Sequence, residues 1–256
     1  MSFIVSVRAE SIKVKRSLAF WLSILGAGFI PVIFLLMYYF RSDVFVLKLA
    51  KDPWRNHILH GWQALSAFLL PMFIILTCSL VTQIEFKNNT WKQVYSSPQT
   101  IGNIFFSKLF VIHCMILFCF LLFNIFLLGS GLLTNLLNRN YSFFSSPVDW
   151  EIVLRMNFKS YISILGISAI QYWLSLRFKN FIASIGIGLA LLITALIIME
   201  WEQIYKVPYA FPLLTFDAIF KRRPLLIENH EWNSIVYFLA FTLLAFFDTK
   251  FRKERG

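Results

Sequence analysis

Charged side chains are scarce in this chain, since Asp, Glu, Lys and Arg make up only 14% of its 256 residues. Soluble domains carry about 25% charged residues and roughly 45–50% apolar ones. Here 58% of the residues are hydrophobic, and the mean hydropathy is +0.68. This composition excludes an ordinary water-soluble domain and predicts an all-α integral membrane protein, because helices satisfy their own backbone hydrogen bonds in lipid.

Acidic residues are few, 13 against 24 Lys and Arg, which leaves a formal net charge of +11. Basic residues beside apolar runs usually face anionic headgroups or set membrane topology. We therefore expect the basic residues to contact membrane lipids, and we expect no nucleic acid as a partner. Cysteines are also few: Cys78, Cys114 and Cys119 fall in apolar runs without paired spacing. They exclude a disulfide framework and are typical of small core residues.

Catalytic motifs are absent: the chain has no Gly-x-Ser-x-Gly, no His-Glu-x-x-His and no phosphate-binding glycine-rich loop. Its apolar runs hold almost no ionisable side chains, which membrane enzymes and ion-coupled transporters usually place there. His57 and His60 lie three residues apart, but no cysteine or carboxylate is clustered with them. We therefore expect no catalytic residue, no metal and no cofactor bound by this chain.

Six apolar runs divide the sequence, and we expect one transmembrane domain over residues 1–256. The first run is about 23 residues long and lacks a cleavage site, so it reads as a retained span. At 1.5 Å per residue it measures roughly 35 Å, enough for a hydrocarbon core of about 30 Å. The last run is short for a crossing unless the bilayer thins or flanking residues snorkel. The expected spans are 18–40, 62–82, 109–133, 160–176, 180–199 and 232–247.

The segment before the first span mixes apolar and basic residues. Phe3, Val7, Val14 and Leu18 fall on one helical stripe, which Glu10 interrupts. This pattern predicts an amphipathic helix in the membrane interface, with an irregular basic flank as the alternative. An even number of spans and dense basic residues at the tail favour cytoplasmic termini.

The polar stretch 83–108 separates the second and third runs. Phe86, Trp91 and Tyr95 offer an aromatic anchor for a groove on a partner protein, and Lys92 adds positive charge beside it. The alternative is a solvated loop with Trp91 at the headgroup belt. The stretch ends on Lys108, at the threshold of the third run.

Two motifs resemble those of type-2 ABC exporter permeases. The run Arg8-x-Glu10-x-x-Lys13-x-Lys15-Arg16-Ser17 is similar to the start of those subunits, where it forms the cytoplasmic interfacial helix. The second motif resembles their first cytoplasmic loop, although Asn88-Asn89 stands where the family commonly has Gly before Thr. Asn tolerates the left-handed turn conformation, so the same geometry is open to it. The residues concerned are Glu85, Phe86, Asn89, Thr90, Trp91, Lys92, Tyr95 and Pro98.

The resemblance implies a half-transporter permease of the bacterial inner membrane, close to small permeases of bacteriocin or lantibiotic immunity and peptide-antibiotic resistance. Two permeases, identical or homologous, would associate with a dimer of ABC ATPase subunits, which bind ATP and Mg²⁺. A coupling helix in the 83–108 stretch would receive the motion of the ATPases. The family-level substrate is hydrophobic or peptide-like.

Two other functions stay open at this point. A polytopic enzyme acting on lipids or peptides would need polar residues such as His57, His60, Glu200 and Glu202 to converge. A non-catalytic membrane scaffold would need none of these residues.

Overall fold

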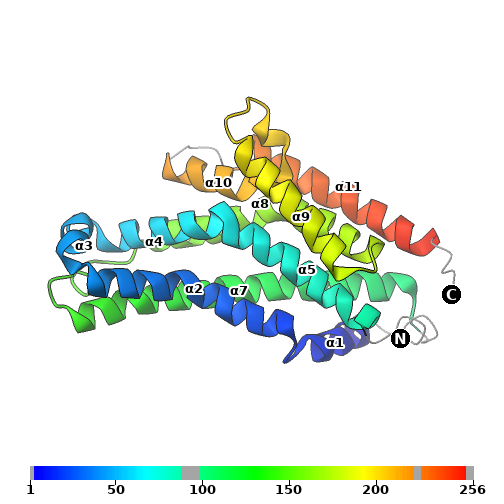
Figure 1. Cartoon of the computed structure of the whole chain (residues 1–256), viewed down its shortest axis with the longest axis horizontal. Helices are drawn as coiled ribbons and strands as arrows, with labels where there is room; N and C mark the ends of the chain where they lie inside the picture. The colour runs from blue at the N-terminus through cyan, green and yellow to red at the C-terminus, as the bar shows by residue number, and fades with distance from the viewer. Residues whose placement is uncertain (1–2, 88–98, 222–225, 252–256) are drawn as a thin grey trace.

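A computed structural model describes residues 3–87, 99–221 and 226–251. Every regular element within these ranges is helical, so the predicted all-α class is confirmed. The longer helices lie in three tiers (Figure 1). The lower tier holds α2 (Leu18–Phe40) and α7 (Ile101–Leu137). The middle tier holds α4 (Pro53–Ala64), α5 (Leu70–Lys87) and α8 (Trp150–Arg177). The upper tier holds α9 (Phe181–Ile197), α10 (Phe211–Phe220) and α11 (Asn229–Phe251).

The N-terminal segment forms a separate helix, α1 (Phe3–Val14), which packs on α7. Arg16 adopts a positive φ of 63°, a left-handed conformation that is uncommon for residues other than glycine. The Ser17 hydroxyl then caps α2 by accepting a hydrogen bond from the Phe20 amide at 3.4 Å. This turn ends α1 before α2 begins, so α1 runs in its own direction (Figure 1).

A short helix, α3 (Ser42–Leu49), precedes a long composite helix that runs from α4 into α5. Pro53 begins it at a first-turn position, where the missing amide hydrogen costs no hydrogen bond. A π-helical turn, Leu65–Leu69, joins the two parts just before Pro71. Proline disrupts regular helical hydrogen bonding, and a π-turn is a common local adjustment. The helix therefore continues through Pro71 into α5.

The 37 residues of α7 make it the longest helix of the described chain. Thr100 caps its start by accepting a hydrogen bond from the Asn103 amide at 3.2 Å. At 1.5 Å per residue the helix measures roughly 55 Å, well beyond a hydrocarbon core of about 30 Å. It extends the expected run 109–133 at both ends, and α2 packs along it.

The most extensive helix–helix packing in the described chain is between α8 and α11. The Gly166 amide donates to Ser234 Oγ at 2.9 Å, and the Ser234 hydroxyl donates to the Ile162 carbonyl at 2.7 Å. A Cβ on Gly166 would lie 3.2 Å from Tyr237 Cβ, so glycine permits this approach. Between the two helices and α9, the 3-10 turns Ile204–Lys206 and Pro208–Ala210 lead into α10, which packs on both α8 and α11.

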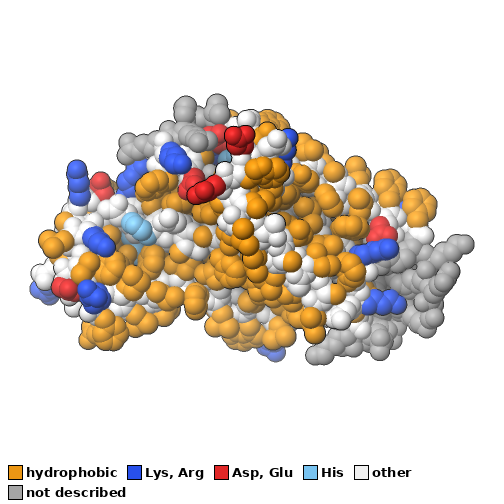
Figure 2. Space-filling model, turned by 45° about the horizontal axis from the view of Figure 1, so that its top comes forward, with side chains coloured by type: hydrophobic (Ala, Val, Ile, Leu, Met, Phe, Trp, Pro, Cys, Tyr) orange, Lys and Arg blue, Asp and Glu red, His pale blue; other side chains and the backbone are white. Residues whose placement is uncertain are grey.

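Four helices of the described chain are long and apolar enough to cross a membrane: Leu18–Phe40, Pro53–Phe86, Ile101–Leu137 and Asn229–Phe251. The apolar helix α9 is shorter, and the first half of α8 carries Glu151, Arg155 and Lys159. The expected count of six spans is therefore not confirmed. Hydrophobic side chains cover most of the face in Figure 2, while charged side chains stand in small groups, several of them at its ends.

Candidate coupling site

Four charged side chains from three helices meet at the end of the molecule where α1, the end of α5 and the start of α7 come together (Figure 1). The Lys108 ammonium donates to Glu10 Oε2 at 2.7 Å and to Glu85 Oε1 at 2.8 Å. The Lys13 ammonium donates to Glu85 Oε1 at 3.0 Å and pairs with Glu10 Oε1 as well. These four residues form a closed charge ring with no net charge, in which each member has two partners of opposite sign.

The charge ring is largely withdrawn from solvent, since the side chains of Lys108 and Glu85 are each 1% exposed. A buried charge without a partner costs several kcal/mol, so the ring is stable only as a set. Burial by itself raises the pKa of Glu10, but Lys108 and Lys13 outweigh it and hold that pKa below its ordinary 4.5. Burial lowers the pKa of Lys13, but Glu10 and Glu85 raise it above 10.5. Both groups are therefore ionised near neutral pH.

The buried stripe of α1 explains how Glu10 reaches the ring. Ser6, Glu10 and Val14 follow one another at four-residue intervals, the spacing of one helix face, and all three are buried. Glu10 interrupts the apolar stripe as a charged residue, and its carboxylate is neutralised from α7 by Lys108. On the same face, the Ser6 hydroxyl donates to Gln99 Oε1 at 3.2 Å, so α1 also contacts the chain two residues before α7.

Glu85 leaves one acceptor unused within the described part of the chain. Its Oε1 accepts from both lysines, while its Oε2 is buried without a hydrogen-bond partner there. Buried polar atoms in proteins are nearly always paired, so an unpaired one calls for an explanation. The atom lies two residues before the end of α5. A free acceptor therefore lies at the point where the chain leaves the helix.

The other predicted site residues fall into two groups. Phe86 is half-buried at the end of α5, and Arg8, Lys15 and Arg16 are exposed on α1 and the turn after it. The remaining predicted residues lie outside the described ranges: Asn89, Thr90, Trp91, Lys92, Tyr95 and Pro98. What the structure adds is that the two sequence motifs meet, through Glu10 and Lys13 of the first and Glu85 of the second.

The residues required by an enzymatic function do not converge. His57 is fully buried, with Nδ1 3.0 Å from the Tyr38 hydroxyl and Nε2 2.8 Å from the Leu127 carbonyl. His60 is exposed and its ring hydrogen-bonds within its own helix, while Glu200 and Glu202 are exposed in the turns after α9. No group of three or more His, Cys, Asp or Glu side chains in the described chain is placed to hold a metal ion.

A second buried ion pair lies away from the charge ring and was missed by sequence analysis. Lys159 Nζ of α8 lies 3.3 Å from Glu231 Oε2 of α11, and these side chains are 4% and 0% exposed. Thr215 of α10 is 2.9 Å from His230 Nε2 and donates to Glu231 at 3.4 Å. Both residues lie just outside the expected apolar runs, Lys159 before 160–176 and Glu231 before 232–247. A signal existed, because each member of the pair stands immediately before an apolar run.

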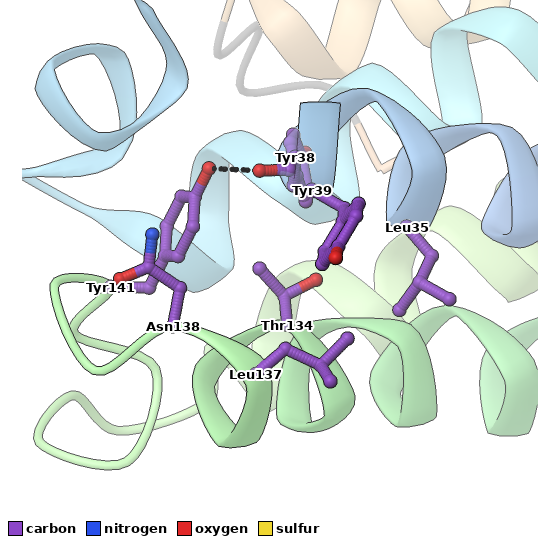
Figure 3. A pocket seen from close by; sticks show the side chains of 7 residues that line it. All are labelled: Leu35, Tyr38, Tyr39, Thr134, Leu137, Asn138 and Tyr141. Carbon is purple, nitrogen blue, oxygen red and sulfur yellow. Dashed lines mark hydrogen bonds between the residues drawn. The ribbon is translucent and has the colours of Figure 1, made fainter. Parts of the chain in front are cut away.

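A small pocket lies at the opposite end of the α2–α7 pair. Its volume is about 140 Å³, and the Tyr141 hydroxyl closes one side by donating to the Tyr38 carbonyl at 2.8 Å (Figure 3). The side chains that line it are uncharged, so the pocket offers hydroxyl and amide groups without an acid or a base. They are Leu35, Tyr38, Tyr39, Thr134, Leu137, Asn138 and Tyr141.

The chain has long apolar helices with buried ion pairs near their ends, and a separate basic helix precedes the first of them. These features define a polytopic membrane protein. Residues 6–195, from α1 to most of α9, match the family described as ABC-2 family transporter protein, and the chain belongs to this family. It is accordingly a membrane component of an ABC transporter, a class that associates with an ABC ATPase. No curated protein and no solved structure matches the chain.

Proposed function

We propose that this chain is the permease subunit of an exporter in the bacterial inner membrane. A separate dimer of ATPase subunits binds ATP and Mg²⁺, and a second permease, identical or homologous, completes the transporter. The spans are α2, the α4–α5 helix, α7, α8, α9 and α11. This arrangement is supported by the position of the start of α1 and the end of α11 at the same end of the molecule, which we assign to the cytoplasm (Figure 1).

The charge ring is the observation that carries the coupling proposal. Glu85 and Lys108 stand on either side of residues 88–98, where the motif residues of the first cytoplasmic loop fall. Because both also bind α1, a force on this loop acts on α1, α5 and α7 as one unit. The length of α7 then carries the displacement through the membrane to the opposite end, where α2 packs against it.

The loop, through Trp91 and its neighbours, and the exposed basic face of α1 bind the ATPase partner. Arg8, Lys15 and Arg16 are exposed at the same end of the molecule as the ring. Basic residues in this position suit both anionic headgroups and an acidic rim on an ATPase. The unused Glu85 Oε2 acceptor lies near the end of α5, from which the chain leads into the loop, and supplies a point for a hydrogen bond that forms on coupling.

Copurification and ATPase assays test this function. We expect the chain to copurify with an ABC ATPase. Trp91→Ala should lower transport-linked ATPase activity by roughly tenfold or more, because truncating an aromatic anchor typically costs about 2 kcal/mol or more of binding free energy. Membrane insertion of the variant should stay intact. Trp201→Ala is the matched control, because Trp201 is an exposed tryptophan in the turns after α9. Absence of any ATPase partner, or equal activity of both variants, would refute the proposal.

The substrate class we propose is a hydrophobic or peptide-like molecule, and the physiological role is immunity to an antibiotic peptide. Cells that express the chain with its ATPase should survive higher concentrations of membrane-active peptides than cells expressing the Trp91→Ala variant. Equal survival on a panel of such peptides would reject this substrate class while leaving the ATPase partnership untouched.

A further inference from the structure

A large, open apolar groove lies in the upper tier. It lies between α9 and α11, over the last turns of α8, and has a volume of about 620 Å³. Pockets for drug-sized ligands have volumes of about 300–1,000 Å³. Ile187 of α9 and Leu244 of α11 form its two walls, and Trp173 of α8 lies between them. The groove is therefore of suitable size and polarity for a hydrocarbon chain.

The mouth of this groove is polar and structured. Asp248 of α11 accepts a hydrogen bond from Trp173 Nε1 at 3.2 Å and pairs with Arg177 Nη1 at the same distance. These contacts hold the end of α8 against α11 and orient the Arg177 guanidinium at the rim. The Arg177 side chain remains 52% exposed. Since a guanidinium carries five N–H donors, Arg177 retains donors for a further acceptor.

Two further basic residues stand near Arg177 and Asp248 in the sequence. Lys179 follows the end of α8 and Lys250 lies near the end of α11, and both are exposed. Arg177 lines the groove itself, and Lys179 follows it by two residues in the turn after α8. Guanidinium and ammonium groups bind phosphate oxygens strongly, the guanidinium in a bidentate manner. The rim therefore complements an anionic phosphate group placed directly above an apolar slot.

We propose that this groove binds an anionic phospholipid from the bilayer, with an acyl chain between α9 and α11 and the phosphate at Arg177 and Lys179. The site lies at the end of the molecule that carries α1 and the charge ring (Figure 1). Under the proposed topology that end faces the cytoplasmic leaflet, whose surface is negatively charged. Only the assignment of the leaflet rests on the proposed function, because lipid binding itself requires no ATPase.

Native mass spectrometry of the purified full chain, titrated with phosphatidylglycerol or phosphatidylcholine in mixed micelles, tests the site. We expect tighter retention of phosphatidylglycerol. Arg177→Gln/Lys179→Gln should weaken its binding by about tenfold or more, since each basic residue near a membrane surface contributes about fivefold. Arg139→Gln/Lys206→Gln, which removes the same charge from exposed residues of other loops, should leave it unchanged. Lys179→Gln alone keeps the Arg177–Asp248 pair and should show a smaller loss.

A second variant probes the apolar slot. Leu244→Trp fills the groove and should weaken retention of both lipids, while Leu239→Trp, on an exposed part of the same helix, should not. Equal phosphatidylglycerol binding by wild type and the Arg177→Gln/Lys179→Gln variant would overturn the proposal. So would a dimer of this chain that dissociates on Leu244→Trp, because a second copy would then cover the groove. Neither result bears on ATPase copurification.

Discussion

Lys108 and Glu85 lie 2.8 Å apart in the interior, each with 1% of its side chain exposed, although 23 residues of sequence separate them. Between them runs the stretch that carries the loop motif of the family, and on their open side lies α1 with Glu10 and Lys13. The pair therefore joins the two sequence motifs into one physical unit. Removing the charge of either residue should lower the free energy of unfolding most, and it should also weaken coupling to the ATPase. Both effects can be measured.

Lys108→Met should destabilise the protein strongly. It retains much of the side-chain volume but leaves Glu10 and Glu85 buried with only Lys13 as a counter-ion, and breaking a buried ion pair in this way costs about 3–5 kcal/mol. Thermal unfolding in detergent measures the effect. Lys15→Met is the control, since Lys15 is exposed at the end of α1 and should shift the midpoint little. Similar midpoints for the two variants would show that the ring contributes no stability.

The pH dependence of stability should have two limbs. The folded-state pKa of Glu10 is below 4.5, so its stabilising contribution is present above the unfolded pKa and is lost as the pH falls through the folded pKa. The pKa of Lys13 is above 10.5, so its contribution is complete below the unfolded value and is lost as the pH rises through the folded one. Glu10→Gln should flatten the acid limb of a plot of unfolding midpoint against pH. An unchanged acid limb would assign that limb to other carboxylates.

The second buried pair predicts a non-additive result. Glu231→Met or Lys159→Met alone leaves one buried charge uncompensated and should cost about 3–5 kcal/mol. The double variant removes both charges and should be more stable than either single variant. Unfolding by denaturant in micelles measures the free energy of unfolding of the two single variants and of the double variant. Simple addition of the two single effects would mean that the 3.3 Å contact is not an energetic pair.

Two glycines two residues apart on α7 should respond in opposite directions to alanine. A Cβ at Gly131 would lie 2.8 Å from the Trp54 ring, which is held by its hydrogen bond to the Phe143 carbonyl at 2.8 Å. Gly131→Ala should therefore destabilise by about 1–3 kcal/mol. Gly129 has nothing within 4 Å of the same position, so Gly129→Ala should stabilise by up to about 1 kcal/mol through helix propensity. Unfolding midpoints of both variants test this contrast.

Much of the architecture followed from local pattern. The apolar run 18–40 became α2, because Ser17 caps its start and no break occurs before Phe40. The ends of the other helices were harder to predict from the sequence, because polar first and last turns extend α7 and α11 beyond their apolar cores. Such turns lie outside the hydrocarbon region or pack on neighbouring helices, so hydropathy does not register them.

The sequence by itself determined that this protein belongs in a membrane, that it is helical, and that two polar motifs resemble those of an ABC exporter permease. These are consequences of composition, hydrophobic run length and short-range spacing. Only the tertiary structure decided that Glu10 and Lys13 close a ring with Glu85 and Lys108, that Lys159 pairs with Glu231, and that α8, α9 and α11 line an open groove. The physical reason is that a buried charge reads in sequence as a break in an apolar pattern. The partner that neutralises it is selected by packing between helices that are distant in the chain.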